Sequence, residues 1–363
     1  MAVNRFTPAT SGAPTLVARR GIDPRCDEDW AALMKGPRGS LFGAPPWISA
    51  IVDTYGFEIS ADLLVDESGK PVSGFVRSEL HDIRTARIVS LPFCDRLDPV
   101  VDTDAQWARL VQPAVARGLP IELRVLGADA PRRDPRFRPT NELAWHATDL
   151  DRPEADILAG FHSMARRNIR TAVRNGLSVR FGADLADVQA FHELHRMTRK
   201  RKYGLLAQPA TFFERIWKEF APLGRLVVGL VSHEGDVIAG NLCLIWNDVI
   251  YYKFGASVPQ RLDLRPNDLL AWESLCLGQK RGCRSFDWGV SDLDQPGLVF
   301  YKQKYATEER RVSVLRYVPD GFEDSLGSDV GRVLHELTQL LTRDDVPDEV
   351  TQRAGEILYQ YFC

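Results

Sequence analysis

The spacing of apolar and polar residues repeats in the two halves of the chain. Two apolar runs flank a polar turn at Val65–Val76, and the same pattern returns at Val231–Leu242, so each segment predicts a β-hairpin. The matched glycines are Gly74 with Gly240 and Gly118 with Gly282, at offsets of 166 (240 − 74) and 164 (282 − 118) positions. Two matches at nearly one offset indicate an internal duplication.

The duplication predicts the organisation of the whole chain. A chain of 363 residues is longer than a single hydrophobic core usually serves, which favours two domains. In each half the predicted order is a hairpin, a strand, a helix and a strand, which is typical of an α/β domain with a mixed sheet flanked by helices. The predicted units are an N-terminal extension (1–39), a first domain (40–150), a second domain (156–320) and a C-terminal helical segment (321–363).

Positions 252–306 carry the most informative pattern. They predict a strand, a turn at 265–268 (RPND), a helix over Leu269–Gln279, a second strand that ends at Asp287 in SFDWG, and a further strand that bears Lys302. Asn267 and Asp268 stand where side chains cap a helix N-terminus, and they also line the predicted cleft. Trp288 is expected either in the wall of a pocket or in the core.

Two helices are predicted at the start of the second domain, over Ile157–Asn175 and Leu185–Lys202. Each carries more positive charge than a helix dipole requires, although the chain has a net charge of −3 and a pI near 6.2. One interpretation is a solvated basic face, and the other is a site for the phosphates of RNA, a nucleotide-sugar or a coenzyme. The phosphate-binding candidates on these helices are Arg166, Arg167, Arg170, Arg174, Arg199, Lys200 and Arg201.

Composition narrows the class of protein. The slight negative charge argues against a nucleic-acid binder held by global charge, so any RNA contact is expected to be local. The six cysteines show neither metal nor disulfide spacing, which is typical of reduced thiols in the cytoplasm. No apolar run has membrane-spanning length and the N-terminal residues lack the order of a signal peptide, so a cytoplasmic location is expected.

The candidate catalytic residues are consistent with a reaction that needs no protein nucleophile, such as acyl transfer to an amine. This reaction needs stabilisation of an oxyanion and a path for a proton, but no protein nucleophile. The sequence has no GxSxG elbow and no HExxH or CxxC motif, and His192 and His195 lack a third ligand, so neither a metal nor another cofactor is predicted. Asp287 is the candidate that accepts or orients the proton of the amine. The alternative for Asp287 is a carboxylate that only terminates the strand.

These motifs together resemble the FemABX family of tRNA-dependent aminoacyltransferases, which are built from tandem GNAT-like domains. The resemblance rests on the capped helix, on Phe-Asp-Trp-Gly at 286–289 and on Tyr-Lys at 301–302, and extends loosely over residues 40–320. It implies two GNAT-like domains that face a shared cleft. It also implies that Lys302 steadies the aminoacyl-tRNA acceptor end and the developing oxyanion, whereas the alternative is a surface lysine.

Further site residues follow from the same resemblance. Segment 41–57 resembles the opening Phe-x-x-x-x-Trp helix of the family, and segment 90–100 resembles its Leu-Pro-Phe-x-Asp loop. The implied substrate-binding candidates are Trp47, Asp95, Arg96, Tyr252, Lys253 and Tyr301, with Lys304 as a further contact to phosphate. A lysine that cell-wall members carry one turn after the tryptophan is absent at positions 49–52, which puts a muropeptide acceptor in doubt.

The donor distinguishes the remaining hypotheses. Acetyltransferases of the GNAT type bind the coenzyme pyrophosphate with the amides of a glycine-rich loop, but the equivalent QRLDLRPND at 260–268 has no glycine. The leading hypothesis is therefore transfer of an aminoacyl group from aminoacyl-tRNA to an amine of a small metabolite or of a peptide or peptidoglycan precursor. The alternatives are an N-acyltransferase that uses acyl-CoA or a carrier protein, and a catalytically silent binding module.

Overall fold

The computed structural model describes residues 16–322 and 327–363. In the first half, β1 to β6, the strands are β1 (Val17–Ile22), β2 (Ile59–Val65), β3 (Pro71–His81), β4 (Ala86–Val89), β5 (Ile121–Val125) and β6 (Arg138–Asp149). Its helices are α1 (Glu28–Lys35), η1 (Leu41–Gly43), α2 (Pro45–Tyr55), α3 (Asp104–Val115) and α4 (Asp129–Arg133).

The second half, from α5 onward, repeats this plan and adds helices at its end. Its strands are β7 (Ser178–Gly182), β8 (Leu226–His233), β9 (Asp236–Trp246), β10 (Val249–Ser257), β11 (Ser285–Asp292) and β12 (Glu308–Tyr317). Its helices are α5 (Glu154–Gly160), α6 (Ser163–Arg174), α7 (Leu185–Tyr203), α8 (Ala210–Phe220), η2 (Pro259–Leu264), α9 (Pro266–Lys280), α10 (Pro296–Gln303), α11 (Gly327–Leu341), α12 (Asp348–Leu358) and η3 (Tyr359–Phe362).

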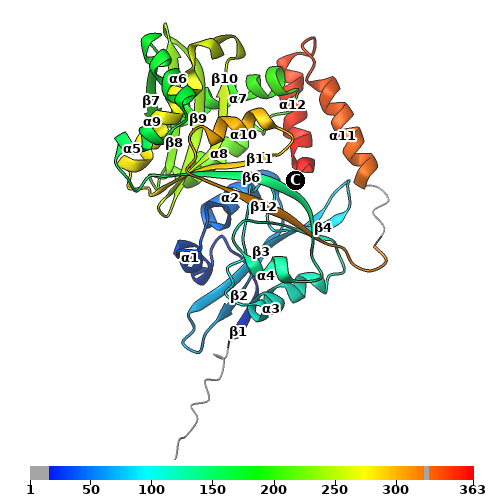
Figure 1. Cartoon of the computed structure of the whole chain (residues 1–363). Coiled ribbons are helices and arrows are strands. Elements are labelled where there is room, and N and C mark those ends of the chain that lie inside the picture. Colours follow the sequence, from blue (N-terminus) through cyan, green and yellow to red (C-terminus); the bar gives the residue numbers. More distant parts are fainter. Residues whose placement is uncertain (1–15, 323–326) are drawn as a thin grey trace, which may run out of the picture.

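All twelve described strands belong to one mixed sheet, in the order β1-β2-β3-β4-β5-β12-β6-β11-β10-β9-β8-β7. This order is symmetric about the contact between β12 and β6. Each half donates its last strand to the other, because β12 pairs with β5 and β6 pairs with β11. Figure 1 shows these strands running between the two lobes of the molecule. The predicted fold class, two tandem domains with mixed sheets and flanking helices, is confirmed, while the strand exchange was not foreseen.

The predicted duplication is visible residue by residue. Gly74 of β3 lies opposite Leu63 of β2, and Gly240 of β9 lies opposite Leu230 of β8. A Cβ atom on Gly74 would lie 2.8 Å from Trp30 of α1, and one on Gly240 would lie 3.1 Å from Phe191 of α7. Both glycines therefore let a helix approach its hairpin closely. Gly118 and Gly282 also correspond, since each has a positive φ, of 65° and 78°, in the turn after a helix.

One hydrophobic core spans both halves. It contains buried residues of α1, α2, α7 and α8 together with strands from each half. At its centre the rings of Trp47 and Phe212 contact edge to face, with their centroids 5.9 Å apart. The other face of the sheet is covered separately, by α3 and α4 in the first half and by α5, α6 and α9 in the second. Because of the shared core, the halves cannot separate without exposing apolar surface.

Three predicted elements differ in the structure. The single helix over Ile157–Asn175 is wrong: it is broken at Phe161, whose extended backbone lets its ring pack on Trp272 and Tyr305. The strand at Lys302 is also wrong, because this segment forms the helix α10, which begins with Pro296 in its first turn. Asp287 does not end its strand, since β11 continues to Asp292 past an irregular register.

The strand exchange should make the two halves unfold together. Val312 of β12 is fully buried among residues of β6 and Leu126, which follows β5, and its amide belongs to the central part of the sheet. We expect Val312→Pro to destabilise the protein by about 3 kcal/mol or more, because proline removes a ladder hydrogen bond. Hydrogen exchange should then increase in both halves. Loss of protection confined to the second half would contradict this coupling.

Candidate active site between the two halves

The site lies where the parallel strands β10 and β11 separate. They pair only over Val249–Tyr251 and Ser285–Asp287, although both strands continue. Just beyond, β11 bulges at Trp288 and Gly289, and Gly289 has a φ of 67°. Such a conformation is favourable for glycine but strained for other residues. The bulge opens a gap between the strands in which charged side chains from both halves meet.

Asp287 is held in a fixed orientation at the start of this gap. Its Oδ1 accepts hydrogen bonds from Trp145 Nε1 at 2.9 Å and from the Gly289 amide at 2.7 Å. Its Oδ2 accepts one from Arg96 at 3.0 Å, and the Arg96 guanidinium lies over the Trp145 ring, 5.3 Å from its centroid. Trp145 and Arg96 belong to the first half and Asp287 to the second. These hydrogen bonds therefore hold the two halves together at the site. Sequence reasoning missed Trp145, because its ring faces Asp287 only through the strand exchange.

A second ion pair crosses between the halves at Asp95 and Lys253. Lys253 Nζ lies 2.6 Å from Asp95 Oδ1 and over the rings of Phe42 and Trp47. Asp95 also packs on the bulge, because a Cβ atom on Gly289 would lie 2.7 Å from Asp95 Oδ2. Trp47 itself is fully buried in the shared core, where it forms a wall beneath Lys253 rather than an exposed contact.

Lys302 reaches this cluster from α10. Its ammonium donates a hydrogen bond to the Val290 carbonyl oxygen at 2.8 Å, and the residue is 5% exposed. Burial lowers the pKa of Lys302 to about 8, against the opposing effect of the Asp95 and Asp287 carboxylates. Lys302 is therefore not a surface lysine, and it changes charge within the range of pH in which many enzymes work.

A buried polar cluster fixes α10 and hence Lys302. Asp268 accepts hydrogen bonds from Lys304 at 2.7 Å and from the Tyr305 hydroxyl at 2.6 Å. The predicted capping role of Asn267 and Asp268 is wrong, because Arg265 occupies the N-cap position and no side chain caps the helix. The Asn267 carbonyl oxygen instead accepts a hydrogen bond from the Tyr301 hydroxyl. The internal ion pair gives no support to a phosphate contact for Lys304.

The aromatic candidates belong to the hydrophobic cluster that α5, α6 and α9 cover in the second half, beside the gap. Trp288 is 1% exposed and donates to Thr148, so its placement is that of a core residue. The Tyr252 ring lies 5.7 Å from the Trp288 ring, and burial raises the pKa of the Tyr252 and Tyr301 hydroxyls. Both tyrosines are therefore neutral and belong to the wall that supports α10.

The basic residues of the two helices have different surroundings. Arg167 and Arg170 are exposed on α6 and have no ion-pair partner in the described part of the chain, and with Arg174 they line a groove of about 550 Å³. Arg166 donates to backbone carbonyls at the end of α5, and Arg199 donates to Leu206. On α7, Lys200 and Arg201 share the single carboxylate of Asp348 in α12, so their positive charge is partly neutralised.

The structure brings Asp95, Arg96, Lys253, Asp287 and Lys302 together around the gap, while the α6 arginines lie apart from them. The two regions are linked, because the His162 ring at the start of α6 packs on Phe300 of α10, with centroids 5.8 Å apart. Phe300 is 44% exposed. A ligand on the basic face of α6 can thus extend to the helix that carries Lys302.

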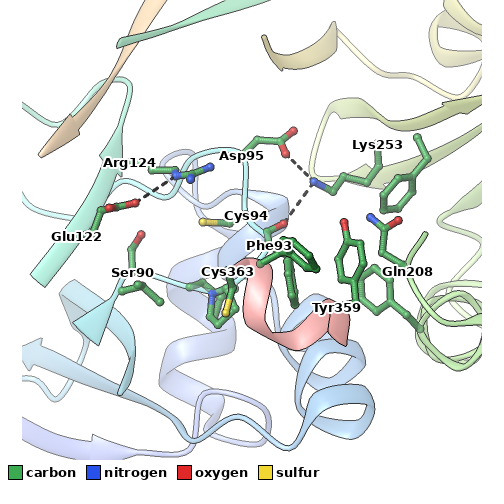
Figure 2. A pocket seen from close by; sticks show the side chains of 16 residues that line it. Ser90, Phe93, Cys94, Asp95, Glu122, Arg124, Gln208, Lys253, Tyr359 and Cys363 are labelled. Atoms are coloured by element: carbon green, nitrogen blue, oxygen red, sulfur yellow. Dashed lines mark hydrogen bonds and ion pairs between the residues drawn. The ribbon is translucent and has the colours of Figure 1, made fainter. Parts of the chain in front are cut away.

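Two cavities flank the first-half side of the site. One, of about 220 Å³, lies at the end of β4 and is lined by Asp95, Lys253, Glu122 and Arg124 (Figure 2). The other, of about 430 Å³, is lined by Val290, Ser291, Glu122 and Arg124. Sequence reasoning missed Glu122, Arg124 and Ser291, since only the folded sheet brings them to the walls of these cavities.

The acidic, histidine and cysteine side chains do not form a metal site in the described residues. No group of three His, Cys, Asp or Glu side chains there could hold a metal ion. His192 and His195 both contact Gln208, and burial lowers the pKa of His195 to about 3. Nor does any helix within 16–322 and 327–363 have the length and apolar character needed to cross a membrane.

Comparison with known proteins identifies the class of this fold. Residues 160–303 match the family model described as "Acetyltransferase (GNAT) domain". No curated protein matches the sequence significantly. A tandem GNAT protein from the clavulanic acid biosynthesis pathway has a similar structure, with a TM-score of 0.51 and 15% identity, over 85% of this chain and 100% of that one. The chain is therefore a protein of tandem GNAT fold.

Within this class the crystal structure of FemX is more similar. Its TM-score is 0.67, with 16% identity, over 87% of this chain and 99% of that one. L-PGS from Bacillus licheniformis is also similar, with a TM-score of 0.51 and 12% identity, over 80% of this chain and 92% of that one. The predicted resemblance to the FemABX family is thus confirmed. Sequence identities this low establish the fold alone, and the match to the GNAT domain supports an acyltransferase.

The cluster around Asp268 generates a prediction about stability. Removing its charge leaves the Lys304 ammonium buried without a partner, which typically costs about 3–5 kcal/mol. Asp268→Asn should lower the free energy of unfolding by this order in denaturant titrations. Asp263→Asn changes an exposed aspartate just before the same helix and should cost little. Equal stability of the two variants would contradict the role of this cluster.

Proposed function

We propose that this protein is a FemABX-like aminoacyltransferase. It transfers an aminoacyl group from aminoacyl-tRNA to an amine of a small metabolite or of a peptide or peptidoglycan precursor. The observation that carries the proposal is the buried Lys302 ammonium at the gap between β10 and β11, 2.8 Å from the Val290 carbonyl oxygen and surrounded by residues of both halves. Lys302 is the lysine to which the family resemblance assigns this role.

The proposed reaction needs no covalent intermediate with the protein. The acceptor ammonium first loses a proton to solvent. The neutral amine then attacks the ester carbonyl of the donor, a C–N bond forms, and the C–O bond to the tRNA ribose breaks. The proton lost by the amine ends on the released ribose hydroxyl. Lys302 stabilises the oxyanion of the tetrahedral intermediate, which is where a fixed cation contributes most.

The carboxylates have a positioning role in this proposal. Asp287 already accepts three hydrogen bonds, so it acts by orienting the amine and Arg96 rather than by holding a free proton. Asp95 offers a further negative charge beside Lys253. Together they attract the ammonium form of an acceptor to the cluster. Trp47, Arg96, Tyr252, Trp288 and Tyr301 are proposed to shape this cleft from behind.

The donor loop supports tRNA over a coenzyme. Segment 259–264 forms the 3₁₀ helix η2, in which the Arg261 and Arg265 amides already bond to backbone carbonyls at 3.0 and 3.1 Å. These amides are therefore not free to cradle a pyrophosphate. The second candidate, an acyl-CoA-dependent N-acyltransferase, is favoured by the GNAT domain match over residues 160–303.

The donor is tested by incubating the protein with tRNA charged with labelled amino acids and with a mixture of amines. We expect label to enter an amide product, and RNase treatment of the charged tRNA to abolish the transfer. Calorimetry with acetyl-CoA should show weak binding or none. Micromolar acetyl-CoA binding that disappears when the 260–268 turn is altered would favour the second candidate instead.

Lys302→Met tests the proposed oxyanion contact. The variant should lower the rate about 10²- to 10³-fold, the usual effect of removing one such donor. The ratio of wild-type to variant rates should fall as pH rises through about 8, because the Lys302 pKa is lowered to about 8 and the ammonium then loses its proton. The ionisation of the acceptor amine changes both rates equally, so it does not affect this ratio.

The same variant separates catalysis from folding. A lowered lysine pKa means that the folded state disfavours the charged form, so the cost to stability is present below pH 8 and disappears as pH rises towards the ordinary lysine value. Lys302→Met should therefore not lower the melting temperature at pH 7. Lys280→Met, at an exposed position of α9, is the control. Full turnover of Lys302→Met at saturating donor would exclude Lys302 from the reaction.

We further propose that Arg166, Arg167, Arg170 and Arg174 of α6 bind the phosphates of the donor, with Arg199 and Arg201 nearer its periphery. Replacing both Arg167 and Arg170 with Gln should weaken donor binding and reduce the slope of log K against log salt by about one for each phosphate-binding arginine replaced. Arg117→Gln with Arg133→Gln removes the same charge from arginines paired elsewhere in the first half. If the two double variants show equal salt dependence, the α6 arginines do not bind phosphate and form only a solvated basic face.

A further inference from the structure

The two cavities beside the site share one wall. Glu122 and Arg124 of β5 line both the cavity of about 220 Å³ that contains Asp95 and Lys253 and the cavity of about 430 Å³ that contains Ser291. In Figure 2 Arg124 lies on one side of Cys94, and the Asp95–Lys253 pair lies on the other. A molecule in these cavities therefore contacts Arg124 and approaches the carboxylate that packs on the β11 bulge.

Arg124 has hydrogen-bonding capacity that the protein does not use. The Arg124 side chain makes no hydrogen bond in the described part of the chain, and its nearest charged partner, Glu122 Oε1, lies 3.8 Å from Nε. Arg124 is 41% exposed towards the cavities, whereas Arg96, on the loop beside it, is engaged with Asp287. A guanidinium whose donors are open is suited to bind a planar anion in a bidentate manner.

A second unsatisfied group points to a ligand in the adjoining cavity. The Ser291 hydroxyl is buried, at 3% exposure, and has no hydrogen-bond partner among the described residues. Buried hydroxyls are normally paired, so a lone one in a cavity wall is expected to find its partner in a bound molecule. Ser291 follows Val290, whose carbonyl oxygen accepts the Lys302 hydrogen bond. Ser291 is thus the next residue in the chain after the one that fixes the Lys302 ammonium.

We propose that the acceptor is an amino acid or a short peptide, whose carboxylate binds to Arg124 and whose amine faces Asp95. This inference rests on the proposed function and names the class of acceptor. The charges in the smaller cavity favour such a zwitterion: Arg124 attracts a carboxylate, while Asp95 and Glu122 attract an ammonium and disfavour a doubly charged phosphate. The Ser291 hydroxyl then bonds a polar group of the remainder of the acceptor.

The test compares acceptors that differ only in the carboxylate. L-Lysine and cadaverine form one pair, and L-alanine and ethylamine form the other. With charged tRNA as donor, kcat/KM should be about 10- to 100-fold higher for the amino acid in each pair, the range expected for a charge-assisted bidentate contact. Arg124→Gln should bring this ratio close to one. Arg117→Gln, which alters an exposed arginine outside both cavities, should leave the ratio as it is.

Calorimetry with L-lysine and cadaverine provides a readout that needs no turnover. L-Lysine should bind more tightly to the wild type, and Arg124→Gln should remove the difference. If amines are acylated but the ratios equal one, or do not respond to Arg124→Gln, carboxylate recognition is overturned while the aminoacyl transfer stands. If no amine is acylated, the proposed function fails, and equal or absent binding of the two probes overturns the inference independently.

Discussion

The exchange of last strands between the halves is the constraint on which the rest of the structure depends. β6 completes the sheet of the second half and β12 completes that of the first. As a result Trp145 of β6 reaches Asp287 of β11, and the loop with Asp95 and Arg96 lies against the β11 bulge. The candidate site is therefore formed by both halves, and neither half has it alone.

The charges at the site are arranged so that most are compensated and one is not. Asp287 is held by Arg96 and Trp145, and Asp95 is held by Lys253, so these groups are fixed before any substrate arrives. Lys302 has only a backbone carbonyl oxygen as its direct partner among the described residues, and burial lowers its pKa to about 8. A preorganised cation of this kind is suited to a negative charge that appears only during the reaction.

Rigidity at the site comes from groups behind it. The Asp268 cluster anchors α10, and the stacked rings of Trp288 and Tyr305 fill the space beneath that helix. The basic face of α6 has no such internal partners at Arg167 and Arg170 within the described chain, and it lies beside α10 through His162 and Phe300. In the proposed function, the fixed groups around Lys302 form the reaction centre and the open basic face of α6 binds the donor.

The sequence alone determined the duplicated hairpins, the helices α7 and α9, the fold class and the family resemblance, because these depend on local periodicity and on short motifs. It also selected Lys302, Asp287, Asp95 and Lys253. It could not place Lys302 on a helix, or pair Asp268 with Lys304 and Tyr305, since both outcomes depend on how α9 and α10 pack in the folded chain. Only the tertiary structure decided that Trp145, Arg124 and Ser291 lie at the site. The strand exchange makes neighbours of strands that are distant in sequence, and the local pattern of residues does not predict this pairing.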